Sequence, residues 1–86
     1  MSTDLYIMRV PVISTAHLPN HEAVGDAEVL SAVYEGGWFV YMEDEYSPDM
    51  PDWYRNAWCW AKQQGFSWIR FDADGDYVEK LEKFIW

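Results

Sequence analysis

The chain has a single cysteine, Cys59, and few positive charges: six Lys and Arg stand against fifteen Asp and Glu. One cysteine excludes an internal disulfide and a cluster of thiolate metal ligands, which suits a reducing compartment. No stretch of the sequence is long and apolar enough to span a bilayer. Residues 1–4 lack the positive charge that opens a signal peptide. We therefore expect a cytoplasmic protein.

The scarcity of cations leaves a formal net charge of −9. A globule of this size exposes about 5,000 Å² of surface, so the surplus is about one negative charge per 600 Å². Such a surface repels nucleic acid and anionic membranes and attracts basic protein surfaces. We expect one domain over residues 1–86, because two cores would each be too small to fold. Its partner should be a protein with a basic surface, and the chain itself a monomer or a homodimer.

Aromatic residues are abundant, with six Trp, six Tyr and four Phe. A buried ring removes roughly 150–250 Å² from water, and a domain this small cannot hide all of these rings. Some should therefore lie at the surface, where Trp and Tyr commonly anchor protein interfaces. Trp53, Tyr54 and Trp58 lie on more than one side of a predicted helix. We expect them to act partly as interface anchors, although helical spacing alone would place them in the core.

Local patterns predict the element order β-α-β-β-α-β in an α+β fold. This order favours a ferredoxin-like sheet with its helices packed on one face. The segment that closes the chain, 77–86, fits either a short helix or a closing strand. Pro51 and Gly65 are the expected limits of the longest helix. The predicted elements are a strand at 5–13, a helix at 19–27, strands at 28–34 and 38–42 around Gly36-Gly37, a helix at 51–64 and a strand at 66–71.

Three segments, ISTAHL at 13–18, GWFVY at 37–41 and WIRFDADG at 68–75, occur in a characteristic order and spacing. Together they resemble a family of small uncharacterised bacterial proteins, some of them carried by phages and plasmids. The resemblance covers residues 13–86 and implies no activity, because the family has none established. Its mobile-element context implies an inhibitor of host defence. The chain has Glu82-Lys83 where the family tends to have a proline, which leaves a helix open where the relatives suggest a strand.

The alternating Asp72, Asp74 and Asp76 follow the pattern of a calcium-binding loop. An EF-hand also needs a glycine at the sixth loop position and a carboxylate at the twelfth. Those positions are Tyr77 and Lys83 here, so we interpret the run as a polar turn without a metal. An irregular cation site remains the alternative.

Ser14, His17 and Cys59 are the residues that could supply a nucleophile and a base. Ser14 is more simply a helix cap, and Cys59 lies between two tryptophans, where a thiol usually behaves as a small buried apolar group. Gly36-Gly37 lacks the lysine and further glycines of a phosphate-binding loop. We therefore expect no catalytic residues, no cofactor and no enzymatic activity.

The leading hypothesis is a non-enzymatic acidic binding protein that occupies a basic site on a host protein complex. Its most specific form is a phage or mobile-element inhibitor that mimics DNA, of the anti-CRISPR or anti-restriction type. The alternative is a small-molecule-binding or cation-binding domain. A DNA mimic needs closely spaced, fixed carboxylates, and two loops would supply them if they meet at one end of the sheet. The candidate residues of this patch are Glu43, Asp44, Glu45, Asp49, Asp52, Asp72, Asp74 and Asp76.

Overall fold

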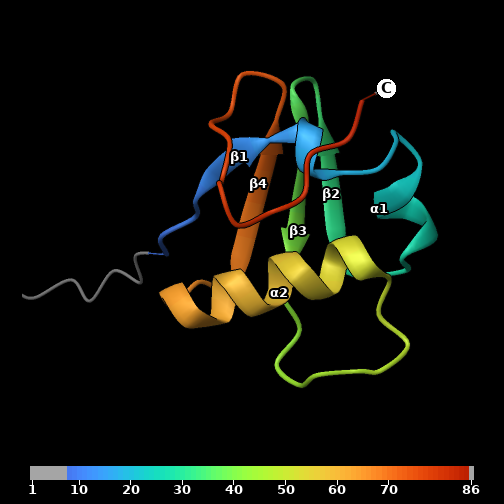
Figure 1. Ribbon diagram of the computed structural model, residues 1–86, viewed down its shortest axis with the longest axis vertical. Coiled ribbons are helices and arrows are strands. Elements are labelled where there is room, and N and C mark those ends of the chain that lie inside the picture. Colours follow the sequence, from blue (N-terminus) through green and yellow to red (C-terminus); the bar gives the residue numbers. More distant parts are fainter. Residues whose placement is uncertain (1–7, 86) are drawn as a thin grey trace, which may run out of the picture.

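The computed structural model describes residues 8–85 and confirms an α+β fold (Figure 1). Its centre is a four-stranded mixed sheet with the strand order β1-β4-β3-β2. The part of the first predicted strand that precedes Met8 lies outside the described residues, as does Trp86. The elements are β1 (Val12–Ser14), the 3-10 helix η1 (Thr15–His17), α1 (Ala23–Asp26), β2 (Ser31–Tyr34), β3 (Gly37–Tyr41), α2 (Asp52–Gln64) and β4 (Trp68–Asp72).

The strand order differs from the expected ferredoxin-like arrangement, which is not confirmed. Strand β1 pairs in parallel with β4 at one edge of the sheet, while β3 pairs antiparallel with both β2 and β4. Helix α2 therefore joins two neighbouring antiparallel strands, β3 and β4. Parallel neighbours require a crossover connection, and here everything between β1 and β4 serves as that connection.

The predicted β2–β3 hairpin is confirmed, but its turn lies one residue earlier than Gly36-Gly37. Tyr34 pairs with Gly37, so Glu35 and Gly36 form the two-residue turn and Gly37 opens β3. Gly37 packs closely on β4, because a Cβ there would lie 1.9 Å from the carbonyl oxygen of Phe71. The second glycine is thus required by strand packing rather than by the turn.

Helix α2 agrees closely with the prediction because both ends carry strong local signals. Pro51 precedes it in an extended conformation with φ −63° and ψ 155°, and Gly65 ends it in the left-handed region at φ 83°. Its inward face packs on the side chains of β3 and β4, with the Trp53 and Phe71 rings 6.0 Å apart. The buried residues of α2 are Trp53, Tyr54, Ala57 and Ala61.

Two segments, 19–27 and 77–85, are less regular than expected. The helix predicted at 19–27 is reduced to the four residues of α1, and the turn before it is closed by the Ala23 N–H, which donates to the Asn20 carbonyl at 3.3 Å. Residues 77–85 form neither of the two predicted elements, a helix or a strand. They run as an irregular segment over η1 and α2, and Leu81 is buried in the core. Phe84 N–H donates to the carbonyl of Ala16 at 2.7 Å.

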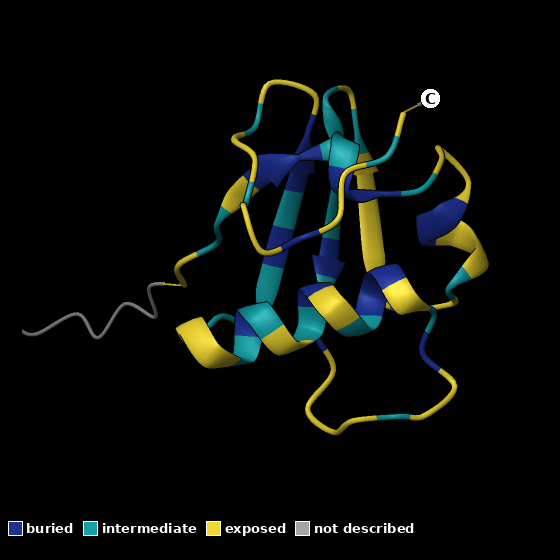
Figure 2. Ribbon diagram, in the orientation of Figure 1, coloured by how far each residue is buried: buried dark blue, intermediate teal, exposed yellow. Residues whose placement is uncertain are grey.

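The helices lie on one face of the sheet, as the sequence predicted. Residues of α1 and α2, and Leu18 directly after η1, belong to the same core cluster as Ile13, Val40 and Ile69, and these buried parts are dark blue in Figure 2. Since side chains alternate along a strand, their neighbours point to the opposite face, which we call the helix-free face. The register of the pairs places Ala32, Tyr34, Phe39, Tyr41, Trp68 and Arg70 on it.

Candidate functional site

The eight candidate carboxylates fall into two groups at opposite ends of the sheet. We call residues 43–52 the acidic loop and residues 72–76 the acidic turn. Asp72 pairs with Gly37 at the start of β3, whereas the acidic loop follows the other end of that strand at Tyr41. A strand of five residues separates its ends by about 13 Å. The condition for one continuous acidic patch is therefore not met, and the two segments project at opposite ends in Figure 1.

The acidic loop presents its charges to solvent. All five of its Asp and Glu residues are exposed, and most of the loop is coloured as exposed in Figure 2. Asp52 forms an ion pair with Arg55 at 2.6 Å. Within residues 8–85 no Lys or Arg forms an ion pair with the other four, which are Glu43, Asp44, Glu45 and Asp49.

The first residue of the acidic loop is fixed to α2 by hydrogen bonds. The Glu43 N–H donates to Tyr54 Oη at 2.9 Å, and Trp58 Nε1 donates to the Glu43 carbonyl at 2.6 Å. Tyr41 Oη donates to Asp44 Oδ1 at 2.9 Å, which ties the next residue to β3. The exposed carboxylates at the start of the loop therefore stand on an ordered base.

A hollow of about 130 Å³ lies between the acidic loop and the segment that leads into β2. Glu28, Glu43 and Asp49 line it, together with Tyr54. Sequence reasoning missed Glu28, which lies far from the loop in the chain. Its positive φ of 56° marks a tight backbone turn that brings it there.

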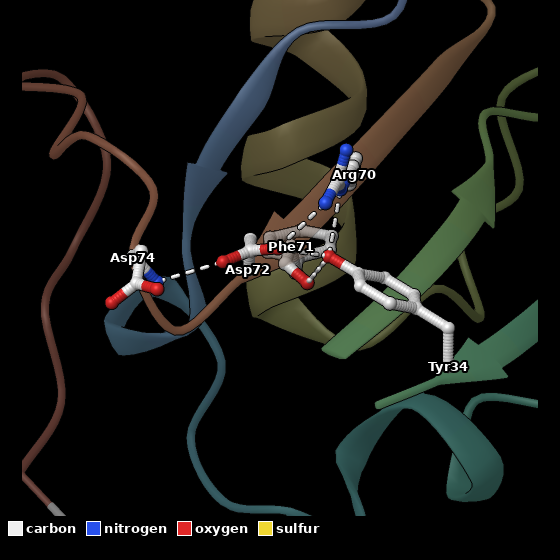
Figure 3. Close-up of polar contacts among 5 residues, drawn as sticks. All are labelled: Tyr34, Arg70, Phe71, Asp72 and Asp74. Carbon is white, nitrogen blue, oxygen red and sulfur yellow. Dashed lines mark hydrogen bonds and ion pairs between the residues drawn. The ribbon is translucent and has the colours of Figure 1, made fainter. Parts of the chain in front are cut away.

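The acidic turn uses its first carboxylate internally, in the cluster drawn in Figure 3. Asp72 Oδ2 accepts hydrogen bonds from Tyr34 Oη and from Arg70 Nη2, the latter at 3.0 Å, and Oδ1 accepts from the Asp74 N–H at 2.8 Å. The Tyr34 hydrogen bond, the Asp74 N–H and Arg70 together hold the pKa of Asp72 below its usual value. Asp72 is buried and therefore does not belong to an acidic binding surface, contrary to the prediction.

Asp74 and Asp76 remain exposed at this end of the sheet. The backbone of Asp76 pairs with β1, since its carbonyl accepts from the Ser14 N–H at 2.8 Å. Within residues 8–85 no group of three or more His, Cys, Asp and Glu is placed to hold a metal ion. The interpretation of residues 72–76 as a turn agrees with the hydrogen bonds that Asp72 accepts from the N–H groups of Asp74 and Gly75.

Two of the three predicted aromatic anchors belong to the core. Trp53 is 7% exposed and Tyr54 is fully buried, with its hydroxyl donating to the Tyr41 carbonyl at 2.8 Å. Neither can anchor an interface, because both face the sheet from the inner side of α2. Trp58 is half-buried beneath the acidic loop, and the exposed Tyr46 lies against it with ring centroids 5.7 Å apart. Sequence reasoning missed Tyr46, whose signal was an aromatic side chain within a run of charged residues.

Ser14 and His17 both form hydrogen bonds within the fold. Ser14 Oγ accepts from the Ala16 N–H at 3.0 Å, which confirms Ser14 as the cap of η1. Buried His17 contacts the Glu82 carbonyl through Nδ1 at 2.9 Å and accepts the Val78 N–H through Nε2 at 2.8 Å. Burial lowers the pKa of His17. Cys59, expected to be buried, is exposed, because it lies on the outer side of α2.

Comparison with known proteins gives a family without an assigned activity. Within residues 8–85 no helix has both the length and the apolar character needed to cross a membrane. No curated protein and no solved structure matches the chain. Residues 10–86 match the C-terminal domain of a family of unknown function, DUF5983. The match covers most of the chain and confirms the resemblance to a family without a known function, so this protein belongs to the DUF5983 family.

Proposed function

We propose that this protein is a non-enzymatic interaction domain that binds a basic surface of a partner protein through the acidic loop. The observation that carries the proposal is the group of four exposed carboxylates that form no ion pair with Lys or Arg of residues 8–85. Five Asp and Glu within ten residues make this the most acidic part of the chain. Exposed charges of one sign steer a partner of opposite charge and raise the association rate.

The ordered base of the acidic loop supports a specific contact. Glu43 is bonded to α2 and Asp44 to β3, so their carboxylates need little further ordering when a partner binds. The hollow lined by Glu28, Glu43 and Asp49 offers a recess beside these charges in which a Lys or Arg side chain can lie. Exposed Tyr46 supplies an apolar side chain at the same place, since Tyr is typical of interface anchors.

The more specific version, an inhibitor encoded by a mobile element, rests on the family resemblance. Mimicry of duplex DNA requires an extended series of charges, about one per 1.7 Å of helix axis. The separation of the acidic loop from the acidic turn by the length of β3 favours a compact contact over such mimicry. We therefore propose that the partner presents a localised basic site, of the size that one loop can cover.

Affinity purification from the native host at two salt concentrations tests the proposal. The test variant carries Glu43→Gln, Asp44→Asn and Glu45→Gln, which removes three charges from the acidic loop. The control variant carries Glu22→Gln, Asp26→Asn and Glu79→Gln, which removes the same number of exposed charges elsewhere. The wild type and the control should retain a basic partner at about 50 mM salt and release it at about 500 mM, because salt screens exposed charges.

The loop variant should lose the partner at both salt concentrations. Equal retention by the two triple variants would contradict the role of the acidic loop, because net charge alone would then explain binding. A recovered partner that is itself acidic, or retention that does not respond to salt, would overturn the electrostatic proposal. Thermal unfolding of each variant, followed by circular dichroism, checks that the fold is unchanged.

A further inference from the structure

Tyr41 and Trp68 form a partly exposed pair of rings on the helix-free face, at the end of the sheet that carries the acidic loop. They are cross-strand partners in β3 and β4, and their ring centroids are 5.2 Å apart at an interplanar angle of 60°. Both are half-exposed, and neither belongs to the core cluster on the other face. Two rings held by neighbouring strands form a rigid surface.

This ring pair is continuous with the acidic loop. Tyr41 Oη donates to Asp44 Oδ1, so a carboxylate of the loop lies at the edge of the pair. Asp44 is exposed, and within residues 8–85 no Lys or Arg forms an ion pair with it. The faces of Tyr and Trp rings attract cations through their quadrupoles, and a nearby carboxylate adds to this attraction.

The opposite end of the same face shows how this chemistry binds a cation. The Arg70 guanidinium lies over the rings of Tyr34, at 4.9 Å, and Phe39, at 5.7 Å, and the carboxylate of Asp72 pairs with it at 3.0 Å. That arrangement comprises two rings, one carboxylate and one arginine. At the acidic-loop end, the two rings are those of Tyr41 and Trp68, and the carboxylate is that of Asp44. Within residues 8–85, however, no Lys or Arg lies over either ring.

We infer that Tyr41, Trp68 and Asp44 receive one Lys or Arg side chain of the partner, which stacks on the rings and pairs with the carboxylate. This inference rests on the proposed function and names the residues that recognise the basic segment. Arginine is the better fit, because its planar guanidinium stacks on aromatic faces and can also donate hydrogen bonds to Asp44. The ring pair could also stack nucleic-acid bases. The phosphates would then face the acidic loop and a chain of net charge −9, which excludes that ligand class.

A synthetic hexa-arginine peptide serves as the probe, with a hexa-citrulline peptide of the same shape but no charge as its control. Both are titrated at low salt into the ¹⁵N-labelled protein, and the indole N–H signals are followed by NMR. The hexa-arginine peptide should shift the Trp68 indole signal and leave that of Trp60 on α2 unchanged. Hexa-citrulline should shift neither. This measurement needs no variant and so does not depend on whether a variant folds.

Binding constants of variants give the second test. Tyr41→Leu should weaken hexa-arginine binding about three- to tenfold, which is the usual range for a cation stacked on a ring. Tyr77→Leu is the matched control, because Tyr77 is exposed at the other end of the sheet, and it should leave the affinity unchanged. Tyr41→Phe keeps the ring and should retain most of the affinity.

The outcomes separate this inference from the proposed function. If the Glu43→Gln, Asp44→Asn, Glu45→Gln variant loses the peptide while Tyr41→Leu keeps it and Trp68 does not shift, the acidic loop binds without the ring pair and the inference is wrong. If hexa-arginine does not bind the wild type at low salt, both the inference and the proposed function are wrong. Equal shifts with hexa-citrulline would also overturn the inference, since stacking would then need no cation.

Discussion

The acidic loop and the acidic turn are both rich in carboxylates and lie at opposite ends of the sheet, yet Asp72 of the turn and the carboxylates of the loop have opposite roles. In the turn, Asp72 is buried and accepts hydrogen bonds from Tyr34, Arg70 and the Asp74 N–H. In the loop, four carboxylates face solvent without a Lys or Arg ion pair among residues 8–85. The difference lies in the donors that the fold brings to each end. A run of acidic residues therefore indicates a binding surface only where its surroundings leave the charge exposed.

The comparison predicts the largest effect for a change that disturbs the packing of the acidic turn. A Cβ at Gly75 would lie 2.4 Å from both the carbonyl carbon and the oxygen of Ile13 in β1. Because these are backbone atoms, Gly75→Ala should push the turn away from β1 and lower the free energy of unfolding by about 2–3 kcal/mol. Urea unfolding measures this. Gly25→Ala, where a Cβ meets nothing within 4 Å, is the control and should be neutral or slightly stabilising. Equal stability of the two variants would contradict the packing described for the turn.

Removing one charge from each segment tests the comparison directly. In Asp72→Asn the amide oxygen can still accept the Asp74 N–H, but the amide NH₂ group then faces the Arg70 and Tyr34 donors. The melting temperature should therefore fall by at least about 5 °C. Asp44→Asn changes an exposed carboxylate whose partner is the Tyr41 hydroxyl, and it should change the melting temperature by less than about 2 °C. Differential scanning calorimetry distinguishes the two. Equal melting temperatures of the two variants would contradict the difference between the two segments.

The segment that follows the acidic turn should respond to pH through His17. Its pKa is lowered by burial, with the positive charge of Lys83 acting in the same direction and the Glu82 carbonyl opposing them. Since Nε2 accepts the Val78 N–H, protonation would place two donors against each other. The unfolded chain then binds the proton more readily than the folded chain. The stability that neutral His17 provides is complete above the ordinary histidine pKa of 6.5 and is lost as the pH falls through the lower pKa of the folded chain.

The melting temperature should therefore fall by a few degrees between pH 7 and pH 5. The contribution of Asp72 changes only at more acidic pH, because its pKa lies below its ordinary value of 3.8. Thermal unfolding at several pH values measures both the His17 effect and the Asp72 effect. His17→Gln should remove this response, because glutamine at this position has no ring nitrogen to protonate. A wild type whose melting temperature is flat over this range would contradict the structural role of His17.

Sequence reasoning succeeded where short-range signals decide the structure. Pro51 and Gly65 delimit α2, and the glycines after Tyr34 place the hairpin within one residue. The acidic loop was correctly expected between β3 and α2, since charge, Ser47 and two prolines oppose both helix and strand there. Each of these features depends on neighbours within a few positions along the chain.

The rest depends on contacts between distant parts of the chain. Tyr34 and Asp72 are 38 residues apart and meet only because β3 lies between β2 and β4. The parallel pairing of β1 with β4 is also long-range, and it determines both the strand order and the backbone contact of Asp76. The burial of Tyr54 depends on which side of α2 meets the sheet. Because α2 has aromatic residues on several sides, its sequence cannot specify that side.

The smallest predicted effect concerns the ion pair between Asp52 of the acidic loop and Arg55 of α2. Arg55 Nη2 lies 2.6 Å from Asp52 Oδ1, but the two side chains are 39% and 85% exposed, so water and salt screen the pair. Arg55→Gln should lower the free energy of unfolding by less than about 0.5 kcal/mol, and the difference should vanish at about 1 M salt. The same change leaves the loop more negative, so it should slightly strengthen hexa-arginine binding at low salt. Urea unfolding of Arg55→Gln thus measures the effect of the ion pair on stability, and peptide titration of the same variant measures its effect on binding. A large loss of stability would show that charge in the acidic loop is structural, as it is in the acidic turn.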